Sequence, residues 1–327
     1  MGLTVLLTVV TPGDPGGTLS RYGIEEFVAD NVVLLRNVRE HSFRRRTVEV
    51  LKMRGAMHHK GDVPFTVVPG RGLVVLPVGE VKQEPAALDA RVSTGNRGLD
   101  GLMDGGPFRG SFTLVSGPTG TGKTMMALQF AMDGAATGER VLLMAYEETR
   151  EQLHLLGRAW GHDLAAYEEQ GLLRIAALYP EVASLDDHLV EIRALVDAFG
   201  PTRLVVDSLS ALERLGSDVS YRTLVIGLTS YVKMIGLASL MTASAPHLVG
   251  GTSVTESHIS GLIDAIIVLR YAEVDSALRR GVLVLKMRAS AHEQQIRELI
   301  IGSGEMTVGE PFRGLGGILT GQVPPRT

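Results

Sequence analysis

The sequence predicts an α/β fold in which a mostly parallel β-sheet is covered by helices on both faces. Short apolar segments alternate with longer segments of helical character through most of the chain. One apolar segment leads into a glycine-rich phosphate loop, and a helical pattern follows that loop directly. Strands and helices that alternate in this way form parallel sheets buried on both sides. A partial copy of the same fold is expected to precede this sheet.

The expected elements after residue 90 follow from the alternation. Strands are expected at residues 112–116, 140–146, 172–176, 203–207, 238–242 and 265–271. Helices are expected at residues 124–136, 150–160, 185–198 and 221–235. One further apolar segment, residues 282–287, follows an arginine-rich turn and is expected to add an antiparallel strand.

An internal repeat organises the chain. The tetrapeptide LKMR occurs twice, and its two final residues, Arg54 and Arg288, are 234 positions apart. Matches at this one offset continue without a gap over a long stretch, which chance cannot produce. Residues 2 to about 77 are therefore a second copy of residues 236 to about 311.

The two copies differ in what precedes them. The later copy belongs to a domain, residues 91–327, that contains the phosphate loop. No such loop precedes the earlier copy, so we expect residues 1–77 to form the back half of a nucleotide-binding domain, with unpaired sheet edges and low stability. Truncation of a longer chain is the expected reason, and a reduced accessory domain is the alternative. Residues 78–90 are polar and aperiodic and contain a proline, which indicates a linker.

Composition disfavours several classes of protein. The net charge of −4 gives no sign of a nucleic-acid-binding surface. The absence of cysteine excludes disulfides and thiolate metal sites and fits a cytoplasmic location. Residues 3–10 are apolar, but they are too short to span a bilayer and lack the features of a signal peptide. We expect no membrane partner, and we expect residues 3–10 to form a buried strand.

The phosphate loop reads G-x-x-x-x-G-K-T from Gly117 to Thr124. Glycines permit a tight loop whose backbone N–H groups surround the phosphates of a nucleotide. Lys123 is expected to reach the β- and γ-phosphates, and the Thr124 hydroxyl is expected to bind Mg²⁺. The loop residues expected to contact ATP are Gly117, Thr119, Gly120, Thr121, Gly122, Lys123 and Thr124.

Acidic residues follow two of the apolar strands. Asp207 ends the segment at residues 203–207, where a carboxylate can hold Mg²⁺ through water. Glu147 and Glu148 follow another strand, and adjacent residues of a strand point to opposite sides. Only one of the two can face the γ-phosphate directly and act as a base. The alternative is a pair of exposed acids that stabilises a helix N-terminus.

Three further features have both a structural and a functional interpretation. Trp160 is the only tryptophan and can pack in the core or stack on an adenine ring. Lys286 and Arg288 lie on one side of a strand and can be solvated or can act on a phosphate across a subunit boundary. Residues 252–261 are rich in hydroxyls, which fits either a plain polar loop or one that carries negative charge.

These motifs resemble those of a known family. The segments GPTGTGKT, AYEETREQL, RLVVDSLSAL, TESHIS and LKMR, in this order, are similar to the second domain of the KaiC family of RecA-like circadian-clock ATPases and autokinases. Residues 2–77 resemble the end of the family's first domain. The resemblance implies a RecA-like P-loop NTPase core and a homo-oligomer, a hexameric ring that binds ATP between subunits.

Roles of individual residues also follow from the resemblance. It implies Glu147, Glu148 and Lys123 as catalytic residues, with Thr124 and Asp207 at the metal. The other positions that match the family's nucleotide contacts are Trp160 near adenine, Arg214 and Arg280 near the interface, and Lys286 and Arg288 from the neighbouring subunit.

The resemblance also implies a phosphate acceptor. Ser260 matches the family's phosphorylated serine, and Thr255 matches a nearby threonine that takes phosphate transiently. We expect the γ-phosphate to go slowly to water and in part to Ser260 of the neighbouring subunit, with Glu147 as the base. Because Gly261 follows Ser260 where the family has a threonine, an ordered two-site phosphorylation cycle is not expected.

Partners and competing functions are also expectations at this point. The chain ends where the family continues into a tail that binds the activator KaiA, so control by KaiA is not expected. KaiB-like proteins or signalling kinases are the candidate partners. A DNA-dependent ATPase like RecA or DnaB is one alternative, although residues 242–261 contain no Lys, Arg or aromatic residue for nucleic-acid binding. An ATP-gated signalling scaffold is the other.

Overall fold

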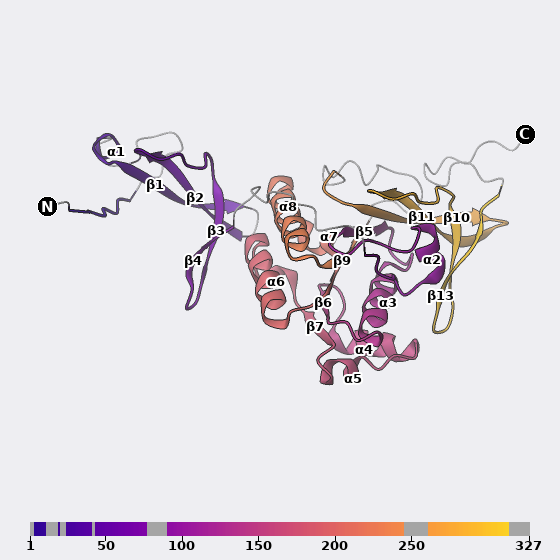
Figure 1. Cartoon of the computed structure of the whole chain (residues 1–327). Helices are drawn as coiled ribbons and strands as arrows, with labels where there is room; N and C mark the ends of the chain where they lie inside the picture. The colour runs from indigo at the N-terminus through magenta and orange to yellow at the C-terminus, as the bar shows by residue number, and fades with distance from the viewer. Residues whose placement is uncertain are drawn as a thin grey trace, which may run out of the picture. The chain divides into compact units, whose positions relative to one another are not determined.

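The computed structural model describes residues 3–10, 19, 24–40, 43–76, 90–244 and 261–313 (Figure 1). The chain divides into two compact units. The first comprises Met1–Arg39 and Arg44–Pro77, and the second comprises Glu40–Phe43 and Val78–Thr327. Almost all of the expected linker lies outside the described residues, so the linker stays a prediction.

A nine-stranded, mostly parallel sheet forms the centre of the second unit. Its strand order is β13-β12-β11-β10-β5-β9-β8-β6-β7. The parallel strands are β5 (Phe112–Gly117), β6 (Val141–Ala145), β7 (Leu173–Ala177), β8 (Arg203–Asp207), β9 (Ala238–Ser244) and β10 (Ala265–Val274). Antiparallel strands continue the sheet from β10: β11 (Ala277–Met287), β12 (Arg297–Ile301) and β13 (Met306–Pro311). The fold class expected from the sequence is confirmed.

Helices flank this sheet. They are α2 (Arg97–Leu102), α3 (Lys123–Ala136), α4 (Arg150–Ala159), α5 (Leu164–Glu169), α6 (Leu185–Phe199), α7 (Leu209–Glu213) and α8 (Asp218–Ile235), with a 3₁₀ turn at Pro180–Val182. Their ends follow local chemistry. Thr149 begins α4 through a capping box with Gln152, and Gly200 ends α6 in the left-handed conformation. None of the helices within the described residues combines the length and apolar character needed to cross a membrane.

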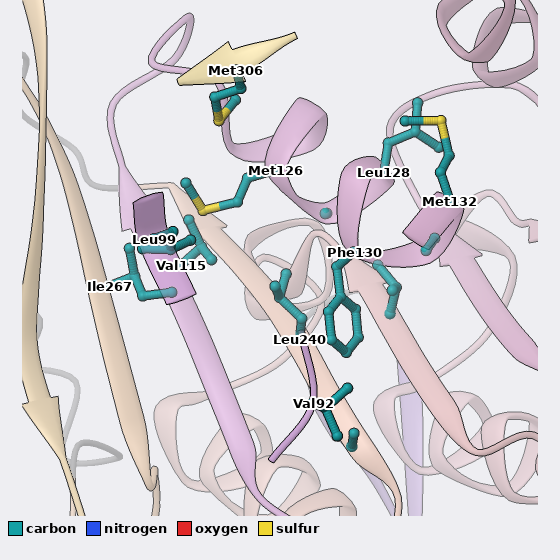
Figure 2. Packing of buried hydrophobic residues seen from close by; sticks show 14 of the residues in the cluster. Val92, Leu99, Val115, Met126, Leu128, Phe130, Met132, Leu240, Ile267 and Met306 are labelled. Carbon is teal, nitrogen blue, oxygen red and sulfur yellow. The ribbon is translucent and has the colours of Figure 1, made fainter. Parts of the chain in front are cut away.

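The main core lies between α3 and the sheet. Met126 and Phe130 of α3 pack with Val115 of β5, Leu240 of β9 and Ile267 of β10 (Figure 2). All residues of β5, β6 and β8 are buried, as expected for strands covered on both faces. The packing of α3 on this core fixes the position of its N-terminus, where the phosphate loop ends.

The first unit contains a four-stranded sheet that repeats the arm of the second. A short helix, α1 (Glu25–Val28), precedes strands β1 (Asn31–Glu40), β2 (Phe43–Met53), β3 (Val63–Val68) and β4 (Gly72–Val75), which lie in that order in the sheet. Each strand begins 234 positions before its counterpart among β10 to β13. The register is also repeated, since Thr47 pairs with Pro64 and Gly281 pairs with Glu298. The sequence repeat is therefore a structural repeat.

The expectation of a buried strand at residues 3–10 is wrong. These residues form no strand, and Leu3 and Leu6 are 88% and 90% exposed. In the second unit the corresponding segment includes β9, which is buried because β5 and β8 pair with its two edges. No described strand of the first unit pairs with residues 3–10, so their apolar side chains lack a sheet to pack in.

Candidate nucleotide-binding site

The phosphate loop lies between the end of β5 and the start of α3. Gly120 and Gly122 have φ angles of +80° and +104°, which side-chain-bearing residues rarely adopt. At Gly117 an added Cβ would lie 2.7 Å from the backbone oxygen of Leu269 in β10. The loop therefore passes its neighbours more closely than other residues allow. It leads into the N-terminus of a 14-residue helix, a position that favours anions.

Lys123 lies inside the loop. Its Nζ atom donates to the Pro118 oxygen at 3.0 Å, and the Thr121 hydroxyl donates to the same oxygen at 2.8 Å. Burial lowers the pKa of the Lys123 ammonium, although Asp207 and the two adjacent glutamates oppose that shift. The structure thus places a buried cation within the field of three carboxylates.

Thr124, Glu148 and Asp207 come together beside Lys123. The Thr124 hydroxyl lies 3.5 Å from Glu148 Oε1 and also bonds with Asp207, which accepts a further hydrogen bond from Thr242. Burial raises the pKa of Asp207. Burial, with the neighbouring charges of Asp207 and Glu147, raises the pKa of Glu148 to about 7. In the absence of a cation, this group of carboxylates holds protons more tightly than usual.

Glu147 has a different environment from Glu148. It is exposed, and its Oε1 atom accepts a hydrogen bond of 2.6 Å from the Ser208 hydroxyl. Ser208 follows Asp207 through a cis peptide bond and also caps α7. The two glutamates therefore contact different partners, Ser208 for Glu147 and Thr124 for Glu148.

The β10–β11 hairpin supplies two more contacts to the loop. Arg280 donates from Nε to the Gly120 oxygen at 3.1 Å, in agreement with its predicted place near the nucleotide. The Tyr271 hydroxyl donates to the Thr119 oxygen at 3.3 Å. Sequence reasoning missed Tyr271, because only the sheet order shows that β10 lies beside the strand that enters the loop.

Trp160 and Arg214 lie at helix ends. Trp160 follows α4 as its C-cap and packs, partly buried, against the core cluster. Arg214 follows α7 as its C-cap and is exposed. The core packing of Trp160 agrees with the structural interpretation of this residue. The contact of Trp160 with adenine and the contact of Arg214 with the interface stay predictions.

Lys286 and Arg288 lie at the opposite edge of the sheet from the phosphate loop. Lys286 Nζ donates to the Ile263 oxygen at 2.8 Å, and Arg288 pairs with Asp264 at 3.5 Å. Asp264 in turn accepts a hydrogen bond from the N–H of Phe112, the first residue of β5. The 6 residues of β5, about 20 Å of strand, separate this edge from the loop. Within one chain these two cations do not reach Lys123.

The first unit repeats both contacts. Lys52 donates to the Ala29 oxygen at 2.8 Å, and Arg54 pairs with Asp30 at 3.2 Å. The two cations therefore have a structural role in each copy of the hairpin. The predicted phosphate acceptors, Ser260 and Thr255, lie outside the described residues.

The described residues suit Mg²⁺ that is held partly by a nucleotide. They contain no group of three or more His, Cys, Asp or Glu side chains that could hold a metal ion alone. The Thr124 hydroxyl and the Asp207 carboxylate are nevertheless adjacent, and Glu148 Oε2 is buried without a hydrogen-bond partner there. Mg²⁺ in such sites takes one or two protein ligands and completes its shell with phosphate oxygens and water.

This fold and site define a P-loop protein of the nucleoside triphosphate-binding class. The family model described as "ATPase: KaiC" matches residues 1–80 and 92–312. The chain therefore belongs to the KaiC family, which confirms the resemblance seen in its motifs.

Individual relatives agree with this family. The circadian clock protein KaiC3 of Synechocystis sp. (strain ATCC 27184 / PCC 6803 / Kazusa) is 46% identical over 321 residues, which cover 98% of this chain and 63% of that protein. The circadian clock oscillator protein KaiC of Thermostichus vulcanus is 42% identical over 321 residues, 98% of this chain and 61% of that protein. The chain thus spans less than two thirds of the length of these relatives.

Proposed function

We propose that this chain binds ATP with Mg²⁺, hydrolyses it slowly and transfers part of the γ-phosphate to Ser260 of a neighbouring copy. The observation that carries the proposal is the convergence of Lys123, Thr124 and Asp207 at the end of β5, where the phosphate loop opens. The names of the relatives, circadian clock proteins, support a role in circadian or related signalling. A cytoplasmic location and KaiB-like or kinase partners belong to the same proposal.

Each residue of the site has a distinct task in this proposal. The loop backbone and Lys123 bind the phosphates, and Thr124 and Asp207 orient the metal. When bound, Mg²⁺ neutralises charge on the phosphate oxygens. Glu147 takes a proton from the attacking water or hydroxyl, because its carboxylate is exposed whereas that of Glu148 faces Thr124. Ser208 holds Glu147 by the hydrogen bond of 2.6 Å.

The position of Lys286 and Arg288 supports an assembly. Because these cations lie at the far edge of the sheet, they can act on ATP only if they come from another copy of the chain. A head-to-tail contact of this kind closes into a ring when its rotation allows it. A hexamer is the ring that the family resemblance implies. The cations would stabilise the charge that develops on the transferred phosphoryl group.

Native mass spectrometry with and without ATP and Mg²⁺ tests the proposal in one measurement. We expect rings that carry nucleotide between subunits and a mass increase that peptide mapping assigns to Ser260. Hydrolysis without phosphate on Ser260 would reduce the function to that of an ATPase. Undiminished turnover by a strictly monomeric chain would contradict the shared site, and severalfold stimulation by single-stranded DNA would favour a DNA-dependent ATPase.

A further inference from the structure

A buried arginine in β10 has no partner for much of its guanidinium group. Arg270 is 7% exposed, and its Nε and Nη1 atoms are buried without a hydrogen-bond partner among the described residues. Burial lowers the pKa of Arg270, yet a guanidinium remains charged in proteins. A buried charge without a partner costs far more free energy than a buried apolar side chain. The environment of Arg270 therefore lacks an anion.

The internal repeat contains the same arginine with its partners present. Arg36 lies 234 positions earlier, at the equivalent place in β1. It donates to Glu49 at 2.7 Å and to Asp62, and Thr47 donates to Asp62 as well. The Arg36 side chain is 36% exposed, so it is less buried than Arg270 although it has two carboxylate partners.

All three polar partners are absent from the second copy. The residues equivalent to Glu49, Asp62 and Thr47 are Leu283, Ile296 and Gly281. Gly281 pairs directly with Arg270 across the sheet, and an added Cβ at this glycine would lie 3.0 Å from Ile296 Cγ2. The second copy has thus kept the cation, buried it more deeply and replaced its acids with apolar side chains.

The position of Arg270 separates it from the nucleotide site. Successive residues of a strand point to opposite faces. Leu269 belongs to the core cluster that packs on α3, and Tyr271 contacts the phosphate loop. Arg270 lies between them in sequence and therefore faces the other side of the sheet. A ligand of Arg270 is distinct from the phosphates held by the loop.

We infer that Arg270 is the centre of an oxyanion-binding site, in which an external anion takes the place that Glu49 and Asp62 hold beside Arg36. The planar guanidinium fork matches the two oxygens of a carboxylate or a phosphate. Two sources supply this chemistry, a free phosphate-type anion and a carboxylate of a second copy of this chain. The inference does not depend on the proposed catalytic function.

A pair of matched variants tests the site in the full chain. Leu283→Glu returns the acid of the first copy to the neighbourhood of Arg270, and Arg270→Met removes the charge while keeping similar volume. The melting temperature (Tm) of each protein is measured against inorganic phosphate at constant ionic strength, without nucleotide. Each bound anion adds about 3–5 °C to Tm for a tenfold increase in phosphate above its Kd.

The expected result is a difference in slope. In the wild type, phosphate binds at both the loop and Arg270, whereas in either variant it binds at the loop alone, so the slope falls to about half. In phosphate-free buffer both variants are expected to melt at a higher temperature than the wild type, because each removes an unpaired buried charge. A lower Tm for Arg270→Met would show an internal partner for Arg270 and overturn the inference.

Sedimentation velocity distinguishes the two sources of the anion. If a second copy supplies a carboxylate, the phosphate slopes are equal and the wild type self-associates more strongly than either variant. If free phosphate is the ligand, the slopes differ and association is the same in all three proteins. Equal slopes together with equal association would overturn the inference.

Discussion

Thr124 Oγ1 and Glu148 Oε1 lie 3.5 Å apart, joining the first turn of α3 to the segment that follows β6. The Thr124 hydroxyl is the predicted ligand of Mg²⁺, and the Glu148 carboxylate is one of the two predicted catalytic acids. Their contact couples the protonation of Glu148 to the state of the metal position. In the absence of Mg²⁺ and ATP, this coupling is measurable as a dependence of stability on pH.

The first prediction concerns Glu148→Gln in the nucleotide-free protein. The folded-state pKa of Glu148 is about 7, raised from 4.5, so the folded state binds this proton more tightly than the unfolded chain. The free energy of unfolding therefore falls as pH rises from 4.5 to 7. Glu148→Gln removes this loss, and it should stabilise the protein by about 2 kcal/mol at pH 8 but much less at pH 5.

Urea unfolding at the two pH values checks this prediction. Glu305→Gln, which changes an exposed carboxylate at a turn, is the control and should leave both stabilities unchanged. An equal gain from Glu148→Gln at pH 5 and pH 8 would rule out the titration of Glu148 as its cause.

The second prediction separates the two glutamates in catalysis. Glu147→Gln should lower the rate of ATP hydrolysis by about 10²–10⁴-fold, the usual contribution of a general base, with ATP affinity unchanged. Steady-state hydrolysis and nucleotide titration give the two quantities. The matched variant Glu148→Gln should alter Mg²⁺ dependence more than the rate at saturating Mg²⁺. A larger loss of rate in Glu148→Gln than in Glu147→Gln would reassign the base.

The third prediction tests completion of the site by a neighbouring copy. Lys123→Ala and the double variant Lys286→Ala, Arg288→Ala should each be inactive alone. In mixed rings at equal amounts, about a quarter of the interfaces combine an intact loop with intact cations, so about a quarter of the wild-type ATPase activity should return. Mixtures that stay as inactive as the separate variants would contradict a shared site.

The fourth prediction concerns the close approach of the phosphate loop to β10. Gly117→Ala places a Cβ 2.7 Å from the Leu269 backbone oxygen, and overpacking of this kind costs about 1–3 kcal/mol in the free energy of unfolding. ATP affinity should fall with it. Gly101→Ala is the matched control, because it lies in α2 with no atom within 4 Å of the added Cβ. That variant should stabilise the protein by about 0.5–1 kcal/mol. Thermal unfolding and ATP titration measure both variants, and a Gly117→Ala protein as stable as the wild type would contradict the steric argument.

The strands of the sheet were largely predictable from sequence. Residues 203–207 agree with β8 at both ends, because a short, fully apolar run between polar turns has few other interpretations. The short helices α2 and α5 were not predicted, since 6 residues carry too little periodicity. Residues 3–10 carry the same apolar signal as a buried strand. Burial depends on neighbouring strands, and a local pattern does not contain that information.

The candidate site was predictable in its parts and not in its arrangement. Lys123 and Thr124 belong to a contiguous motif whose chemistry follows from the motif itself. The assignment of Thr124 to Glu148 and of Ser208 to Glu147 depends on how β6 and β8 lie side by side, with Ala145 paired to Asp207. Tyr271 was missed for the same reason.

By itself the sequence determined the phosphate loop, the 234-residue repeat and the KaiC family, because each of these is a pattern of residues along the chain. Only the tertiary structure decided that Lys286 and Arg288 lie at the far edge of the sheet from Lys123, and that Arg270 is buried without the acids that accompany Arg36. These relationships depend on strand order and register, which arise from contacts between segments far apart in the chain.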